Sequence, residues 1–145
     1  MFKSILVPID GSKLALKAVA MAGKLAASSG AKLTVVTALP SFPTIVGGEG
    51  YMIAPISVKQ WDDVIEKRSN SIKQAATKQL KDVKFDFLEV ASDQPYAVII
   101  AAAKKRKCDL IVMASHGRKG LSQLLLGSET TKVLAHSTIP VLVCR

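Results

Sequence analysis

Short runs of consecutive apolar or β-branched residues alternate along this chain with segments of helical pattern. The runs are Ile5–Ile9, Leu33–Val36, Leu110–Ala114 and Val141–Val143, and a further strand is expected at 84–90. Runs without a polar side are typical of strands covered on both faces, as in a parallel sheet. The repeated strand–helix order therefore predicts an α/β fold, a single open five-stranded parallel sheet with helices on both faces.

Helix-start signals separate the strands. Ser12 is the expected cap of the first helix, which stops at Gly30, and Ser57 with Gln60 matches a capping box for the second. Trp61 is expected to anchor that second helix. The four helices are expected over 12–29, 57–82, 95–107 and 128–136.

Two segments depart from the buried strand pattern. Residues 84–90 place Phe85 and Phe87 on one side and charged residues on the other, which indicates a half-exposed strand at a sheet edge. Residues 39–56 are rich in Pro and Gly, and at about 18 residues they exceed the usual loop length. We expect this second segment to be a flap or a binding loop.

Length and composition limit the class of protein. The 145 residues predict one domain, 1–145, and 49% apolar with 21% charged residues excludes a disordered or collagen-like chain. The two cysteines are too far apart for a CxxC motif, which favours a reducing compartment. The start of the sequence lacks the pattern of a signal peptide, and the least charged stretch carries too much Pro and Gly for a membrane helix. We therefore expect a soluble cytoplasmic protein without a membrane partner.

Twenty basic against eleven acidic residues give a net charge of +9 and favour anionic partners. The basic residues are scattered along the sequence, aromatic residues make up only 5%, and no stacking motif interleaves them. A nucleic-acid partner is for these reasons not favoured. The run 104–107 is interpreted as a solvated helix end, where cations complement the helix dipole.

Ligands of open α/β sheets bind beyond the carboxyl ends of the strands, and two segments follow such ends. One is Asp10–Ser12, and the other is 114–120, which leads on to Gly127 and Ser128. In the second segment Gly117, Gly120 and Gly127 are expected to allow positive φ and close approach of a ligand. Arg118 and Lys119 add charge, and the free N–H groups at the start of the next helix suit a phosphate.

Ordinary structural roles compete with this interpretation. Gly-rich loops after strands are common, and neither GxxxxGK[ST] nor GxGxxG after the first strand is present. Asp10 can simply brace the first turn, and Ser128 can be only the cap of its helix. His116 is a candidate acid or base, but a lone loop histidine more often makes a backbone hydrogen bond. From the residues alone, both interpretations stay open.

Three segments together resemble the universal stress protein family. They are Ile111–Arg118 followed by Gly127 and Ser128, the start Ile5–Ser12, and the tail His136–Val143. The likeness extends over nearly the whole chain and is least clear in 40–60. It implies the sheet order 3-2-1-4-5, a homodimer and, in one branch, ATP binding through G-x2-G-x9-G-[S/T]. Ala114 stands here in place of the first glycine of that motif.

The resemblance implies an adenine-nucleotide site, with ATP accompanied by Mg²⁺ held mainly by phosphate oxygens. Asp10 would lie near the ribose, Pro8 and Ile9 would flank the base, and Ala38 would form part of the adenine wall. No side chain is assigned to catalysis or to the metal. The expected nucleotide contacts are Pro8, Ile9, Asp10, Ala38, Met113, Ala114, Ser115, His116, Gly117, Arg118, Gly127, Ser128, Glu129 and Thr130.

The resemblance favours an ATP-binding stress protein whose nucleotide state alters dimer or partner contacts. A nucleotide-independent dimeric module and a slow ATPase or phosphotransferase are the alternatives. Between Asp109 and Glu129 the sequence holds no carboxylate that could face a metal, so we expect weak hydrolysis at most. The homodimer is expected through Val141, Leu142 and Val143, because a bare apolar edge strand invites pairing.

Overall fold

The computed structural model describes residues 1–43, 45–46, 52–53, 56–117 and 125–145. Its main sheet has five parallel strands in the order β5-β2-β1-β6-β7. This confirms the predicted α/β fold and the order 3-2-1-4-5. The strands are β1 (Ser4–Pro8), β2 (Lys32–Leu39), β5 (Asp86–Ala91), β6 (Leu110–Ala114) and β7 (Val141–Cys144).

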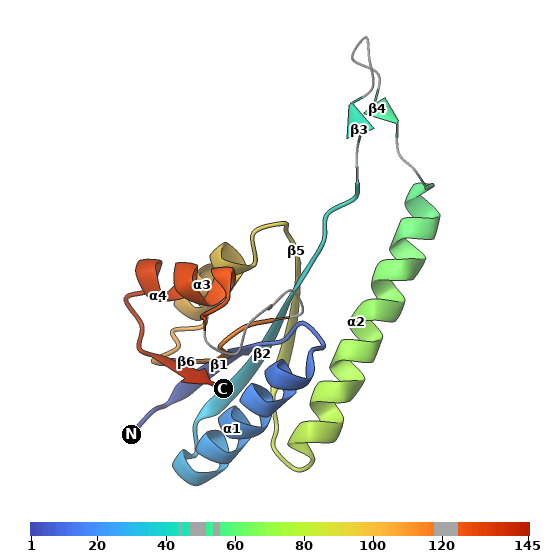
Figure 1. The fold of residues 1–145 in the computed structure, drawn as a ribbon. Coiled ribbons are helices and arrows are strands. Elements are labelled where there is room, and N and C mark those ends of the chain that lie inside the picture. The colour runs from blue at the N-terminus through green and yellow to red at the C-terminus, as the bar shows by residue number, and fades with distance from the viewer. Residues whose placement is uncertain (44, 47–51, 54–55, 118–124) are drawn as a thin grey trace.

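Helices cover both faces of the sheet (Figure 1). The helices α1 (Lys13–Ser29) and α2 (Val58–Leu80) contact each other on one face, and α3 (Pro95–Lys105) and α4 (Ser128–His136) on the other. Among the described helices, none is long and apolar enough to cross a membrane.

The central strands bury side chains on both sides. In β1, Ile5 and Val7 pack in the cluster beneath α1, while Leu6 points to the cluster beneath α3 and α4, and all three are fully buried. Successive strand residues face opposite sides of a sheet, so burial of both sides requires an uninterrupted apolar run. Each such side chain contributes about 1.5–3 kcal/mol on burial, which makes these runs the main source of stability.

The helix boundaries follow the expected caps with one exception. Ser12 accepts a hydrogen bond from the Ala15 N–H at 3.1 Å, and the Ser57 capping box forms as predicted. The suggestion that Ser128 caps the last helix is wrong. Gly127 is the cap, with φ −63° and ψ 156°, and Ser128 is already the first helical residue.

The segment expected as a flap or binding loop contains strand structure. Ile45–Val46 (β3) pairs antiparallel with Met52–Ile53 (β4), and β2 itself continues to Leu39. Figure 1 shows this pair projecting beyond the sheet beside the first turns of α2. The predicted flap, residues 39–56, falls partly outside the described residues, which omit 44, 47–51 and 54–55.

The long helix α2 is anchored through its C-terminal half. All its buried residues lie there, namely Ser69, Ile72, Ala76 and Leu80. In the first half Trp61 is only partly buried, and its ring meets Phe42 edge to face at 6.2 Å between centroids. The predicted anchoring role of Trp61 therefore reduces to one aromatic contact at the base of the projecting segment.

Both cysteines are free thiols in the structure. Cys108 is buried beneath α3 and receives a hydrogen bond from the Ser4 hydroxyl at 3.4 Å, while Cys144 ends the edge strand β7. Burial raises the pKa of both thiols. At neutral pH they are therefore protonated and weakly nucleophilic.

A carboxylate joins the starts of two central strands. Asp109 accepts hydrogen bonds from the backbone N–H groups of Lys3 at 2.8 Å and Ser4 at 3.0 Å. Its own N–H donates to the Ser4 carbonyl at 2.9 Å. The hydrogen bonds from the Ser4 and Lys3 backbone hold the pKa of Asp109 below its usual range.

The variant Asp109→Asn tests this brace. The amide cannot accept as many hydrogen bonds as the carboxylate. We therefore expect the free energy of unfolding to fall by about 1 kcal/mol at neutral pH. This value is near the low end for hydrogen bonds to a charged group, because the site is partly exposed. Because the pKa of Asp109 is lowered in the folded state, its hydrogen bonds stabilise the fold fully at pH values above the unfolded-state pKa of about 3.9. This stabilisation is lost as the pH falls through the folded-state pKa. The gap between wild type and variant should therefore shrink below about pH 4 in urea titrations.

Asp82→Asn is the matched control, since Asp82 is exposed and makes no hydrogen bond or ion pair within the described part of the chain. It should leave stability unchanged at every pH. A gap for Asp109→Asn that is the same at acid and neutral pH contradicts the assignment.

Candidate functional site

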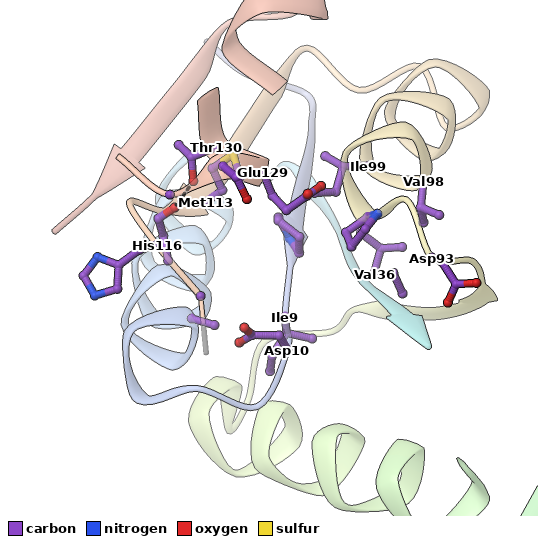
Figure 2. A pocket seen from close by; sticks show the side chains of 18 of the residues that line it. Ile9, Asp10, Val36, Asp93, Val98, Ile99, Met113, His116, Glu129 and Thr130 are labelled. Atoms are coloured by element: carbon purple, nitrogen blue, oxygen red, sulfur yellow. Dashed lines mark hydrogen bonds between the residues drawn. The ribbon is translucent and has the colours of Figure 1, made fainter. Parts of the chain in front are cut away.

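A cavity of about 410 Å³ opens at the carboxyl ends of the strands (Figure 2). It lies where β1 and β6 are neighbours, which is the point where the strand order reverses. Open α/β sheets bind their ligands at such a switch point, and this volume falls within the range of small-molecule sites. The loops after β1 and β6 and the start of α4 form its walls.

Most of the residues predicted for the site line this cavity. Ser115 does not line it, and Arg118 lies outside the described residues. The predicted residues that do line it are Pro8, Ile9, Asp10, Ala38, Met113, Ala114, His116, Gly117, Gly127, Ser128, Glu129 and Thr130. Segments more than a hundred residues apart in sequence are thus brought together.

Asp10 joins the first loop to the loop after β6. Its Oδ1 accepts from the Ser12 N–H at 2.9 Å, so it braces the first turn as well as lining the cavity. Its Oδ2 lies against Gly117, where an added Cβ would come within 2.5 Å of it. A side chain at position 117 would therefore require the Asp10 carboxylate to move.

The loop glycines act by lacking a side chain. Gly127 has φ −63°, and Gly117 is not among the described glycines with positive φ, so the expectation of left-handed turns is wrong for both. A Cβ on Gly127 would lie 3.0 Å from Cα of His116 and 3.3 Å from the Ser115 carbonyl oxygen. The Gly127 N–H donates to that carbonyl at 2.7 Å, which explains the tight packing. Gly120 lies outside the described residues.

The start of α4 is fastened to the end of β6. Thr130 is buried, and its hydroxyl donates to the Ala114 carbonyl at 2.9 Å. Ser115 is also buried, and its N–H donates to the Cys144 carbonyl at 2.7 Å. Ser115 thus supports the wall of the cavity from behind. The first N–H groups of a helix have no acceptor within it, and here they belong to residues at the cavity wall.

Glu129 is engaged in a contact between helices. Its Oε2 accepts from the Tyr96 N–H in the first turn of α3 at 2.8 Å, where the cap residue Gln94 makes no side-chain hydrogen bond. Its Oε1 pairs with the Lys132 ammonium at 3.2 Å. Glu129 therefore acts as the missing cap of α3 while it lines the cavity.

His116 has no carboxylate partner among the described residues. Its Nδ1 lies 3.2 Å from the Ser115 hydroxyl, and Figure 2 shows its ring pointing away from the other labelled side chains. A general base needs to reach the proton it removes. In this orientation the imidazole does not reach a proton of a molecule in the interior of the cavity.

One side of the cavity is apolar. It is formed by Ile9 after β1, Val36 of β2, Met113 of β6, and Val98 and Ile99 of α3. Figure 2 places Val36, Val98 and Ile99 together on the side away from His116. A flat aromatic base fits such a surface, while donors are available at the start of α4.

The sequence interpretation missed Arg68 and Asp93. Arg68 belongs to α2, and its Nε is buried without a hydrogen-bond partner among the described residues. Asp93 follows β5 and accepts from the Ser41 N–H at 3.1 Å. A lone arginine within an amphipathic helix gives no local signal. Asp93, in contrast, follows a predicted strand and could have been found by the rule on strand ends.

The charges at the cavity are mixed. Asp10, Asp93 and Glu129 face it together with Arg68, and no group of three His, Cys, Asp or Glu side chains able to hold a metal occurs in the described part of the chain. The apolar side can receive a flat ring, and the N–H groups at the start of α4, rather than the side-chain charges, are the donors available to anionic oxygens.

Comparison with known proteins agrees with this geometry. The model of the Universal stress protein family matches residues 1–145. A universal stress protein of Thermus aquaticus is 32% identical over 147 residues, covering 100% of both chains. Among solved structures, the MJ0577 protein of Methanocaldococcus jannaschii has a TM-score of 0.73 at 27% identity, covering 99% of this chain and 96% of that one.

A second solved structure is a universal stress protein in complex with cAMP. It has a TM-score of 0.67 at 25% identity and covers 98% of this chain and 95% of that one. The likeness extends over the full sequence and includes the segments that build the cavity. The chain belongs to the universal stress protein family.

Proposed function

We propose that this protein binds ATP, and that the bound nucleotide alters its contacts with itself or with a partner. The observation that carries the proposal is the cavity at the β1/β6 switch point, with an apolar side opposite the N-terminus of α4. Helix N-termini favour phosphate through free N–H groups and the helix dipole. The cAMP complex of a relative supports an adenine nucleotide as the ligand class.

In this proposal the base lies against Met113, Val98 and Ile99, with Ala38 beside it. Asp10 accepts from a ribose hydroxyl through its carboxylate. The phosphates lie against Gly117, Gly127 and Ser128, at the N–H groups of the first turn of α4, which have no acceptor within the helix. Arg118 is proposed as an additional phosphate contact.

Ala114 replaces a glycine of the family motif. Ala114 is 8% exposed and packs in the core cluster on the α1 side of the sheet. Most of the methyl group is therefore covered by protein, which supports binding despite the substitution.

Mg²⁺ is proposed to accompany ATP. The donor set supports coordination mainly by phosphate oxygens and water, because the described residues offer no cluster of three ligand side chains. Magnesium sites of this kind commonly use few protein carboxylates.

Hydrolysis is proposed to be slow. Glu129 is occupied by Tyr96 and Lys132, and the His116 ring points away from the other labelled side chains. With Mg²⁺ and ATP we expect less than about one turnover per second, below the usual enzyme range. Phosphate release measured at that rate or above contradicts this part of the proposal.

A homodimer is proposed through the β7 edge. The sequence of β7 is VLVC without a charge, and Leu142 is 40% exposed. The opposite edge, β5, carries Asp86 and Glu89, and charges on edge strands discourage pairing. Pairing of two β7 strands across a twofold axis would cover the apolar edge.

Nucleotide binding is tested with Gly127→Val. The added side chain meets His116 and Ser115 and should displace the start of α4 from the loop after β6. We expect wild type to bind Mg-ATP with a micromolar dissociation constant and the variant at least about tenfold more weakly, a loss of about 1.4 kcal/mol. Isothermal titration calorimetry measures both constants.

Ala27→Val is the control, because Ala27 is exposed near the end of α1 and is not among the cavity-lining residues. It should bind ATP like wild type. Wild-type binding no tighter than about millimolar would falsify the ligand assignment and favour the nucleotide-independent module.

The dimer is tested with Leu142→Lys. A charge on each facing edge should shift sedimentation from dimer to monomer at about micromolar concentration, because buried unpaired charges are strongly unfavourable. Val90→Lys is the matched control, since Val90 is 39% exposed on the opposite edge strand. A wild-type protein that sediments as a monomer contradicts the proposal.

A further inference from the structure

Basic side chains gather at the end of the sheet opposite the cavity. In a parallel sheet all strand starts and the ends of the preceding helices lie together, so distant segments meet there (Figure 1). All of these side chains are exposed. The basic face consists of Lys3, Lys32, Lys81, Lys84, Lys104, Lys105, Arg106 and Lys107.

Four of these lysines, the row, stand at the starts of neighbouring strands. Strand register places two of them, Lys32 and Lys84, level with each other, and the residue level with Lys32 in β1 is Ser4, next to Lys3. The Lys32 N–H donates to the Lys3 carbonyl at 2.9 Å, which places the starts of β2 and β1 side by side. Thr34 pairs with Asp86, so Lys84, two residues before Asp86, is level with Lys32. Lys107 precedes β6, the next strand. Neighbouring strands are about 4.8 Å apart, so the row runs across the end of the sheet at which the strands begin.

The carboxylates at this end neutralise little of that charge. They are Asp82, Asp86 and Asp109. Asp86 already pairs with Arg106 at 2.9 Å, and Asp109 is used by the backbone N–H groups of Lys3 and Ser4. The lysines of the row make no ion pair with any described residue, so their charge faces solvent.

The helix dipole accounts for only part of this pattern. Lys104 and Lys105 lie in the last turn of α3, where cations are favoured. Lys3, Lys32 and Lys84, in contrast, precede or begin strands and belong to no helix.

Two lysines of the basic face, one of them in the row, occupy strained backbone positions. Lys81 and Lys107 have φ of 48° and 51°, a region that favours glycine and costs other residues about 1–2 kcal/mol. The corresponding residue after α1 is Gly30, with φ 71°. Strain of this kind points to a role for the side chain itself.

We propose that the basic face binds the phosphate backbone of double-helical nucleic acid, independently of base sequence. The basic residues are scattered in the sequence but adjacent in space, which removes the main reason against such a partner. A linear row of cations matches a linear array of phosphates, and backbone contacts need no aromatic stacking. Stable membrane attachment needs an apolar surface as well, and the exposed large apolar side chains described at this end are few, namely Met1, Phe2 and, in the last turn of α4, Leu134.

The test is fluorescence anisotropy with a labelled duplex DNA of about 30 base pairs and mixed sequence, titrated at several salt concentrations. We expect a dissociation constant of about 10⁻⁶–10⁻⁴ M at physiological salt, with a steep salt dependence. The variant K3Q/K32Q/K84Q should bind at least about tenfold more weakly at low salt and show a salt slope shallower by about 2.7, because each of the three lost phosphate contacts removes about 0.9.

The control K17Q/K59Q/K67Q removes the same charge from exposed lysines of α1 and α2. It should bind within about threefold of wild type, because these side chains lie outside the row. If the row variant loses stability, K104Q/K105Q/K107Q replaces it with the same expectation.

Equal weakening by row and control variants overturns the proposal, since net charge alone would then explain binding. Absence of binding at low salt overturns it as well, as does tighter binding to phosphatidylserine vesicles than to the duplex. The ATP titration of the same variants reports on the cavity separately, so failure of either assignment is distinguishable from failure of the other.

Discussion

Burial of the parallel sheet on both faces is the constraint on which the rest of the structure depends. Because Leu6 and Val7 point to opposite sides and both are fully buried, β1 can lie only in the interior of a layered structure. Helices must then cover both faces, and each helix must return the chain to the same end of the sheet. This connectivity collects the loops after the strands at one end, where the cavity lies, and the basic residues at the other.

The cavity depends on close backbone packing. Gly127 and Ser115 are joined by a hydrogen bond, Thr130 holds α4 to β6, and Gly117 leaves room for Asp10. At both glycines an added Cβ would lie close to a neighbouring atom, while their backbone angles are ordinary. Glycines at fixed spacing here correspond physically to a set of short interatomic distances. At Ala114, in contrast, the residue packs into the core cluster.

Local sequence signals predicted the helices and strands well. The residues that were missed depend on how distant segments of the chain pack together. The apolar runs and the caps at Ser12 and Ser57 were sufficient for the sheet and helices, because burial and hydrogen bonding at these positions are local properties. Most of the cavity followed from the strand ends and the family resemblance. Arg68 was missed because its approach to the cavity depends on how α2 packs. The basic face was missed because register, rather than sequence proximity, sets its lysines side by side.

Glu129 has a mechanical consequence. It lies in the first turn of α4 at the cavity wall and at the same time holds the first turn of α3 through Tyr96, while Lys132 approaches the ring of that tyrosine at 5.3 Å. A displacement of the start of α4 would therefore act directly on α3 through this hydrogen bond. If a ligand in the cavity moves α4, the outer surface of that helix pair is where another molecule would meet the change.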